Sequence, residues 1–290
     1  MYYLNNTTYN EKTLMGRLRR YFLIYFETFS VSTADSLFLL ILSILALESA
    51  HSIRFLYHHF LSGITKRSLN VFYYACSYAK VDYSNFMNIT ARTALKLIPD
   101  PLKTHPVFLC VDDTMVSKSG KKFENVSKLF NHAAHNGSNY LNGHCFVSIM
   151  LCVPVLDHDK ISYLSVPLGY GYRMWQKKES KLELAASMIR QVMPEFLSKE
   201  HVIILCDSWY TKKNLVSIID EYPNLDLIGN ARIDSVMYDL APERTGRRGR
   251  PAKHGKRLCV ETDFTFSKEK IGDYYTGVRR VFTKIFGDRE

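Results

Sequence analysis

Two adjacent aspartates, Asp112 and Asp113, directly follow a short run of strand-forming residues, FLCV at 108–111. A carboxylate at the end of a buried strand needs a partner, because removing a lone charge from water is costly. Aspartate is common in such a place as a turn opener or as a helix N-cap. The alternative with chemical consequences is a metal site, which requires a second acid in a matching position elsewhere in the chain.

Asp207 provides that second acid. It follows HVIILC, residues 201–206, a continuous apolar run typical of a parallel strand that is buried on both faces. If this strand neighbours 108–111, Asp113 and Asp207 meet at one edge of the sheet, where they repel each other unless a cation lies between them. Oxygen ligands of this kind suit Mg²⁺ or Mn²⁺. Such ions can activate a water or a 3′-hydroxyl for phosphoryl displacement, so we expect Asp113 and Asp207 to bind metal and to act on nucleic acid.

The elements that would hold these acids follow from the hydrophobic pattern. Three strands, a helix, a strand, a helix and a last strand are expected, in this order, at 108–111, 144–155, 161–168, 178–193, 201–206, 211–222 and 225–228. An antiparallel meander followed by right-handed αβ units gives a mixed five-stranded sheet with flanking helices. This is the order of the α/β ribonuclease-H-like fold, in which the first and fourth strands are neighbours.

An all-helical region precedes this pattern. Glycine and proline are scarce in residues 1–100, and apolar residues recur there at helical spacing. Two of the expected helices, at 66–79 and at 84–97 with Ser84 as N-cap, form either a helix-turn-helix or an ordinary helix pair. Pro99-Asp100-Pro101 marks a boundary. We expect three domains: a helical N-terminal domain at 1–103, a catalytic core at 104–230 and a basic, β-rich segment at 231–290.

Composition and charge favour a soluble protein with a polyanionic partner. The net charge of +10 indicates nucleic acid first and an anionic membrane surface second. The six cysteines include no CxxC pair, which is typical of free thiols in a reducing cytoplasm. The start MYYLNNTTYNEK does not resemble a signal peptide, and the longest apolar run, Leu37–Leu47, is too short to cross a bilayer. We therefore expect a cytoplasmic protein without a membrane segment.

A basic stretch near the end of the chain is the main candidate for contact with DNA. Residues 244–257 contain seven basic side chains and no acid: Arg244, Arg247, Arg248, Arg250, Lys253, Lys256 and Arg257. Such a density of positive charge favours binding to DNA phosphates. The RGRP core at 248–251 could in addition insert into the minor groove. The alternative is that the stretch is a solvated loop. Trp175 is a second candidate, either stacking on an unpaired base or packing in the core.

Four stretches together resemble bacterial insertion-sequence transposases of the DDE superfamily, in the group with a β-rich insertion before the catalytic glutamate. They are VDDT at 111–114, NHAAHNGSNYLNGHCFVS at 131–148, ILCDSWYTKKNL at 204–215 and RIDSVMYDLAPERTGRRGRPAKHGKRL at 232–258. In that family the first catalytic aspartate directly precedes a threonine, which selects Asp113 with Asp112 as the alternative. The second corresponds to Asp207.

The resemblance implies a function and a set of partners. A transposase of this kind, a homodimer when active, would bind the terminal inverted repeats of its element through the helical N-terminal domain. It would cleave double-stranded DNA with Mg²⁺ or Mn²⁺ and transfer the strand to target DNA. In a bacterium it would work in the cytoplasm, associated with the nucleoid.

The resemblance also implies a third carboxylate, a glutamate in a Y-x2-R-x3-E-x6-K pattern on a later helix. The sequence contains no such pattern and ends at Glu290 inside the β-rich segment. We therefore expect a C-terminally truncated element, or an upstream reading frame that is joined to a second one by frameshifting. The alternatives are a DNA-binding remnant that does not cleave, and a host nuclease of the ribonuclease-H-like type.

Overall fold

The computed structural model describes most of the chain and divides it into two compact units, residues 1–89 and 90–290. The expected domain boundaries at 103 and 230 stay predictions. Within the part of the chain that the structure describes, no helix is both long and apolar enough to cross a membrane. The described residues are 13–49, 51–120, 124, 126–130, 140–172, 180–196, 201–232, 234–243, 249–283 and 286–289.

The first unit is helical, as its sequence pattern predicts. Its elements are α1 (Leu14–Phe26), α2 (Val31–Ala46), α3 (Ile53–Leu56), the π-helix η1 (Tyr57–Leu61), α4 (Ser62–Ile64), α5 (Leu69–Tyr78) and the first half of α6 (Tyr83–Leu95). Apolar side chains from α2, α3, η1 and α5 form one core, which consists of Leu39, Leu40, Leu56, Leu61 and Phe72. Asp82 caps α6 by accepting a hydrogen bond from Asn85 N at 3.0 Å, so the prediction of Ser84 as N-cap is wrong.

One buried ion pair crosses this helical unit. Arg19 of α1 contacts the carboxylate of Asp35 of α2, and their side chains are only 5% and 6% exposed. Arg67 approaches the other carboxylate oxygen at 3.3 Å and also donates to Ser36 Oγ at 2.8 Å. Because charges are costly to bury, Asp35 requires these partners and they require Asp35.

The second unit is built on a mixed sheet, whose strands are β1 (Val107–Ser117), β2 (Ser127–Phe130), β3 (Tyr140–Asp157), β4 (Lys160–Tyr172), β5 (Val202–Cys206) and β6 (Leu225–Gly229). β3 pairs antiparallel with both β1 and β4, whereas β1–β5 and β5–β6 pair parallel. The order is therefore β4-β3-β1-β5-β6, and the short β2 lengthens the sheet beside β3. This is the order and direction of a ribonuclease-H-like sheet, and the predicted fold class is confirmed.

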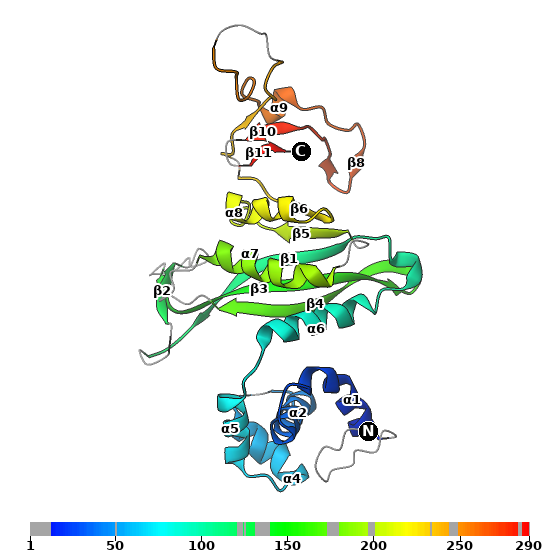
Figure 1. Cartoon of the computed structure of the whole chain (residues 1–290), viewed down its shortest axis with the longest axis vertical. Helices are drawn as coiled ribbons and strands as arrows, with labels where there is room; N and C mark the ends of the chain where they lie inside the picture. The colour runs from blue at the N-terminus through cyan, green and yellow to red at the C-terminus, as the bar shows by residue number, and fades with distance from the viewer. Residues whose placement is uncertain are drawn as a thin grey trace. The chain divides into compact units, whose positions relative to one another are not determined.

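Helices cover one face of this sheet. α7 (Lys181–Val192) lies across it and contacts β3 and β4 (Figure 1). A capping box fixes its first turn, because Ser180 and Glu183 each bond the other's backbone N–H. The helix expected at 211–222 is shorter than predicted, with one α-helical turn, α8 (Lys213–Val216), continued by a 3₁₀ stretch, η5 (Ser217–Glu221). α8 packs beside α7.

The segment after β6 is rich in short strands, as expected. It contains β7 (Met237–Tyr238), α9 (Val260–Asp263), β8 (Lys270–Ile271), β9 (Tyr274–Tyr275), β10 (Val281–Thr283) and β11 (Gly287–Arg289). β10 pairs with both β7 and β11 in a three-stranded sheet, and β8 and β9 form a two-stranded one. The ring of His254 contacts both Tyr238 and Phe282, with ring centroids 4.0 and 5.4 Å away, and anchors part of the basic stretch to this sheet.

Candidate active site

β1 runs straight through both aspartates. The prediction placed them at the tip of a short strand, but β1 continues to Ser117 and pairs Asp112 with Ser148 and Asp113 with Val147 of β3. The extension forms because the long β3 gives these residues a partner well beyond the buried part of β1. Successive side chains of a strand point to opposite faces. The two aspartates therefore face opposite sides of the sheet.

Asp113 faces α7 and is held by three side chains. Its Oδ2 lies 2.7 Å from Lys181 Nζ and 3.5 Å from Cys145 Sγ, and its Oδ1 accepts a hydrogen bond from the Tyr210 hydroxyl at 3.1 Å. We name Asp113, Cys145, Lys181 and Tyr210 the Asp113 cluster. The side chains of Asp113 and Lys181 are 15% and 13% exposed, and Tyr210 is fully buried. Asp113 is therefore paired and largely enclosed.

Asp112, within β1, and Asp207, directly after β5, both follow the last pair of the parallel β1–β5 ladder. The last pair of the β1–β5 ladder is Val111 with Cys206, so the next residue along each strand is one of these aspartates. Both are exposed. Oδ1 of each carboxylate accepts hydrogen bonds from backbone amides. Asp112 accepts one from Asp113 N at 2.7 Å. Asp207 accepts two, from Trp209 N at 3.0 Å and from Tyr210 N at 3.3 Å.

The donor set at this edge fits a hard divalent ion. In the part of the chain that the structure describes, neither a hydrogen bond nor an ion pair engages Oδ2 of Asp112 or Asp207. Two exposed carboxylates, each with an open oxygen, are the ligands that Mg²⁺ and Mn²⁺ prefer. No group of three acidic, histidine or cysteine side chains suited to a metal occurs among the described residues.

The groups around this edge are held in their protonated forms. Burial, with the negative charge of Asp113 as a smaller cause, raises the pKa of Tyr210, so its hydroxyl remains a hydrogen-bond donor. Burial, together with the nearby Asp207, raises the pKa of the Cys206 thiol to about 11. Burial also raises the pKa of Cys145. Burial therefore keeps both thiols protonated in the metal-free protein, and the exposed carboxylates are the better match for a hard divalent ion.

Two lysines lie over the ring of Trp209, whose backbone N–H bonds Asp207. Lys212 Nζ lies 4.1 Å from the centroid of the Trp209 ring, and Lys181 Nζ lies 4.9 Å from it. Lys181 is already paired with Asp113, so Lys212 is the ammonium group at this ring that could meet a phosphate. This arrangement suits a phosphate that approaches Asp207, and the partly buried Trp209 offers a ring beside it.

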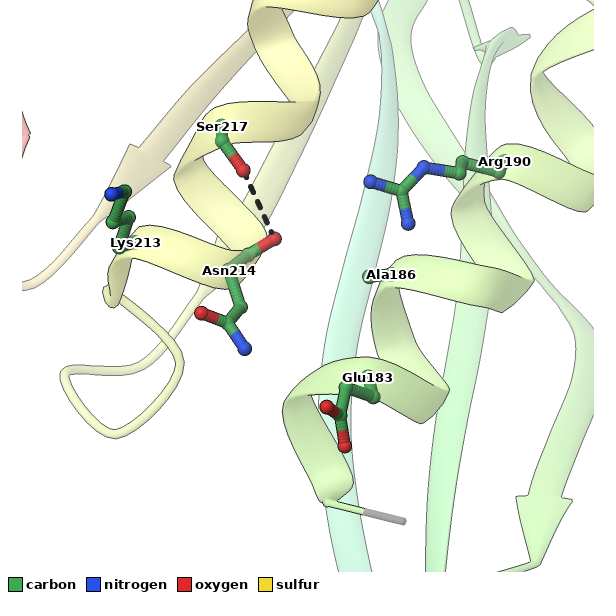
Figure 2. Close-up of a pocket in the computed structure, with 6 residues that line it drawn as sticks. All are labelled: Glu183, Ala186, Arg190, Lys213, Asn214 and Ser217. Atoms are coloured by element: carbon green, nitrogen blue, oxygen red, sulfur yellow. Dashed lines mark hydrogen bonds between the residues drawn. The ribbon is translucent and has the colours of Figure 1, made fainter.

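A separate cleft of about 400 Å³ lies between α7 and α8 and contains none of the candidate acids. Figure 2 shows its lining residues: Glu183, Ala186, Arg190, Lys213, Asn214 and Ser217. Arg190 is already bonded to Glu221 by two hydrogen bonds, of 2.8 and 2.6 Å, and Glu183 closes the capping box. Most of the charge in the cleft is therefore engaged, and the acidic edge is the better candidate site.

The predicted DNA-binding residues fall into two groups. Arg244, Arg247, Arg248 and Trp175 lie outside the described residues. Arg250, Lys253, Lys256 and Arg257 are described, and all four are exposed. Lys256 bonds Asp263 at 2.5 Å, whereas Arg250 and Lys253 have no ion-pair partner within the described ranges. The structure brings none of these four residues together with Asp113 or Asp207 in any described contact.

Lys181, Tyr210 and Cys145 were not predicted as part of the site. Each lies far from Asp113 in the sequence, and their hydrogen bonds to it span 68, 97 and 32 residues. The sequence did contain one signal for Lys181. It is the first residue of an amphipathic helix that covers the sheet, and a lysine in that place can reach an acid that faces the helix.

A ribonuclease-H-like sheet that has one exposed aspartate in β1 and another directly after β5 defines a class of domain whose chemistry would depend on carboxylates. The particular family follows from the sequence. The model of the DDE superfamily endonuclease family matches residues 72–271, well over half of the 290-residue chain. The chain therefore belongs to the DDE superfamily of endonucleases. No curated protein matches it in sequence.

Two solved structures are similar in part. A piggyBac transposase synaptic complex with hairpin DNA aligns with 13% identity and a TM-score of 0.37, over 71% of this chain and 43% of that one. The Mos1 Strand Transfer Complex aligns with 10% identity and a TM-score of 0.22, over 79% of this chain and 80% of that one. The chain thus spans less than half the length of the piggyBac transposase chain. Family membership rests on the sequence match alone.

Proposed function

We propose that this protein acts as a transposase that cleaves double-stranded DNA at the ends of an insertion sequence and transfers the strand to a target. The observation that carries this proposal is the pair of exposed aspartates, Asp112 of β1 and Asp207 directly after β5, which both follow the last pair of the β1–β5 ladder. Membership in the DDE superfamily of endonucleases supports the reaction class.

Asp112 is the first acid of the pair in this proposal, in place of the predicted Asp113. Asp113 already has an ammonium group at 2.7 Å and a hydroxyl at 3.1 Å on its carboxylate. A metal at Asp113 would have to displace Lys181 from a position that is mostly closed to water. Asp112 needs no such displacement, because its side chain points to the opposite, exposed side.

Asp112 and Asp207 would hold Mg²⁺ or Mn²⁺, and a bound ion of this kind lowers the pKa of water and stabilises a leaving oxygen. The chain's own groups orient these acids. Backbone amides fix one oxygen of each carboxylate and leave the other open toward solvent. Lys212 and Trp209 would position the phosphate and sugar beside Asp207.

A purified-protein assay tests this function directly. The chain is mixed with supercoiled plasmid, and conversion to nicked circles is followed with Mn²⁺, with Mg²⁺ and with EDTA. We expect nicking that requires the ion. Retention of DNA without nicking in any ion would instead favour the second candidate, a DNA-binding protein without cleavage. That candidate is favoured by one observation: among the described residues, no group of three acidic, histidine or cysteine side chains is placed so that it could hold a metal ion.

The exposed basic residues give a separate prediction about DNA binding. The double change Arg250→Ala with Lys253→Ala should weaken binding to any sequence, because these side chains have phosphates as their proposed partners. Loss of two phosphate contacts lowers the slope of log K against log salt by about 1.8. The measurement is fluorescence anisotropy of a labelled duplex at several salt concentrations.

A charge-matched control separates contact from net charge. Lys268→Ala with Lys270→Ala removes the same charge from two exposed lysines outside the basic stretch. An equal fall in slope for both double variants would mean that Arg250 and Lys253 do not contact the phosphates themselves.

We place the active protein in the cytoplasm as a homodimer. The free cysteines fit a reducing compartment, since Cys110 and Cys152 stay unbonded with their sulfurs 3.8 Å apart.

A further inference from the structure

An unbroken chain of bonds connects Asp112 to Asp207 through the Asp113 cluster. Asp112 is joined to Asp113 by a peptide bond, and the carboxylate of Asp113 accepts the hydroxyl of Tyr210 at 3.1 Å. The backbone N–H of the same Tyr210 donates to Asp207 Oδ1 at 3.3 Å. Tyr210 thus bonds Asp207 through its backbone N–H. Through its hydroxyl it bonds Asp113, the residue next to Asp112.

In this connection the side chain of Tyr210 is buried, and the charge of Asp113 is paired. Tyr210 is fully buried, so its ring cannot swing away from the position in which both bonds are made. Lys181 neutralises Asp113, which would otherwise add a third negative charge to Asp112 and Asp207. Lys181 is itself fixed, because it is the first residue of α7 and the capping box holds that turn.

The β1–β5 ladder alone does not fix the two acids against each other. It ends at Val111 and Cys206, one residue before Asp112 and Asp207, so the acids lie just beyond the last paired positions of these strands. Asp207 belongs to a turn, and its geometry depends on the amides of Trp209 and Tyr210. The Asp113 cluster supplies the contact across this gap that the backbone does not.

We propose that Asp113, Lys181 and Tyr210 are positioning residues that hold Asp112 and Asp207 at the separation required to share a divalent ion. The inference rests on the proposed function, because it assigns the metal to Asp112 and Asp207. The three residues do not touch the ion. They act on it by fixing its ligands, as hydrogen-bonded groups behind metal ligands do in other proteins.

Binding of Mn²⁺ to the purified chain without DNA, followed by electron paramagnetic resonance, tests this role. Tyr210→Phe removes the hydroxyl but keeps the ring and the backbone N–H that bonds Asp207. We expect the Kd for Mn²⁺ to rise about 10-fold. Tyr163→Phe is the matched control, because it removes a hydroxyl that bonds Pro106 O on the same sheet, and it should leave the Kd unchanged. An unchanged Kd in folded Tyr210→Phe would overturn the inference.

A double-mutant cycle separates positioning from a general effect on packing. If the hydroxyl acts through Asp113, Tyr210→Phe should raise the Kd much less in an Asp113→Asn background than in the wild type. Equal increases in both backgrounds would contradict the proposed connection. Lys181→Met is the further variant if Tyr210→Phe does not fold, and we expect it to raise the Kd as well; an unchanged Kd in Lys181→Met would then overturn the inference.

The wild type distinguishes failure of this inference from failure of the proposed function. If the wild-type chain binds no Mn²⁺, the metal site itself is wrong and the positioning role falls with it. If the wild type binds Mn²⁺ and Asp112→Asn or Asp207→Asn removes it, but Tyr210→Phe binds normally, only the positioning role is overturned.

Discussion

Asp207→Asn is expected to reduce Mn²⁺-dependent nicking of supercoiled DNA about 1,000-fold or more and to leave DNA binding unchanged. Removing one of two metal-binding carboxylates costs several kcal/mol of transition-state stabilisation, and about 4 kcal/mol corresponds to that factor. Asparagine keeps the side-chain shape and an oxygen for the amides of Trp209 and Tyr210, so the turn after β5 should persist. The loss would therefore be chemical and not structural.

Three further substitutions complete this experiment. Asp112→Asn should be as inactive as Asp207→Asn, whereas Asp113→Asn should retain part of the activity because it only positions the ligands. Asp226→Asn is the control: it alters an exposed carboxylate of β6 that pairs with His201 and should nick normally. If Asp113→Asn abolishes nicking while Asp112→Asn does not, the assignment by family resemblance is correct. Normal nicking by Asp207→Asn would show that Asp207 is not a catalytic acid.

The sheet could be predicted from the sequence because its signal is local. The apolar run of β5 and the alternating burial of Val107, Leu109 and Val111 in β1 follow from which side chains must leave water. Strand order then follows from the general rule that crossovers are right-handed. The same rules place Asp207 directly after β5, where the structure has it.

The length of β1 could not be predicted in the same way. Residues Asp112 to Ser117 contain two acids and no apolar run, and they become strand only because β3 offers a partner from Ser148 to Gly143. Pairing between segments far apart in sequence overrides local preference. The consequence for the site is large, since one position along a strand decides which face an acid points to. This is why the sequence left Asp112 and Asp113 as alternatives that only the register separates.

The Asp113 cluster was hidden for a related reason. A hydrogen bond between Tyr210 and Asp113 is a product of the β1–β5 pairing and of the tight turn after Asp207 together. Neither Tyr210 nor Lys181 belongs to a spacing pattern that would point to Asp113. Buried polar side chains find their partners in the folded state, so their pairing becomes visible only with the tertiary structure.

Asp35→Asn is expected to destabilise the helical unit, residues 1–89, by about 3–5 kcal/mol, the usual cost of leaving a buried charge without its partner. Arg19 would keep its charge in a position where its side chain is 5% exposed. Asparagine has nearly the same volume as aspartate, so the effect would report charge and not a cavity. With a typical dependence on urea, the midpoint of unfolding should fall by about 2 M.

Two probes make this experiment specific to the helical unit. Both tryptophans, Trp175 and Trp209, lie after residue 89, so fluorescence follows only the second unit. Circular dichroism at 222 nm is dominated by helices, most of which lie in the helical unit, whereas α7 to α9 of the second unit contribute a smaller part of the signal. We expect Asp35→Asn to lower the urea midpoint seen by circular dichroism and to leave the fluorescence midpoint in place. Asp100→Asn, which breaks an exposed pair with Lys103, should move neither. A circular dichroism midpoint that stays at the wild-type value in Asp35→Asn would mean that Arg19 finds another partner, and that the ion pair does not hold α1 against α2.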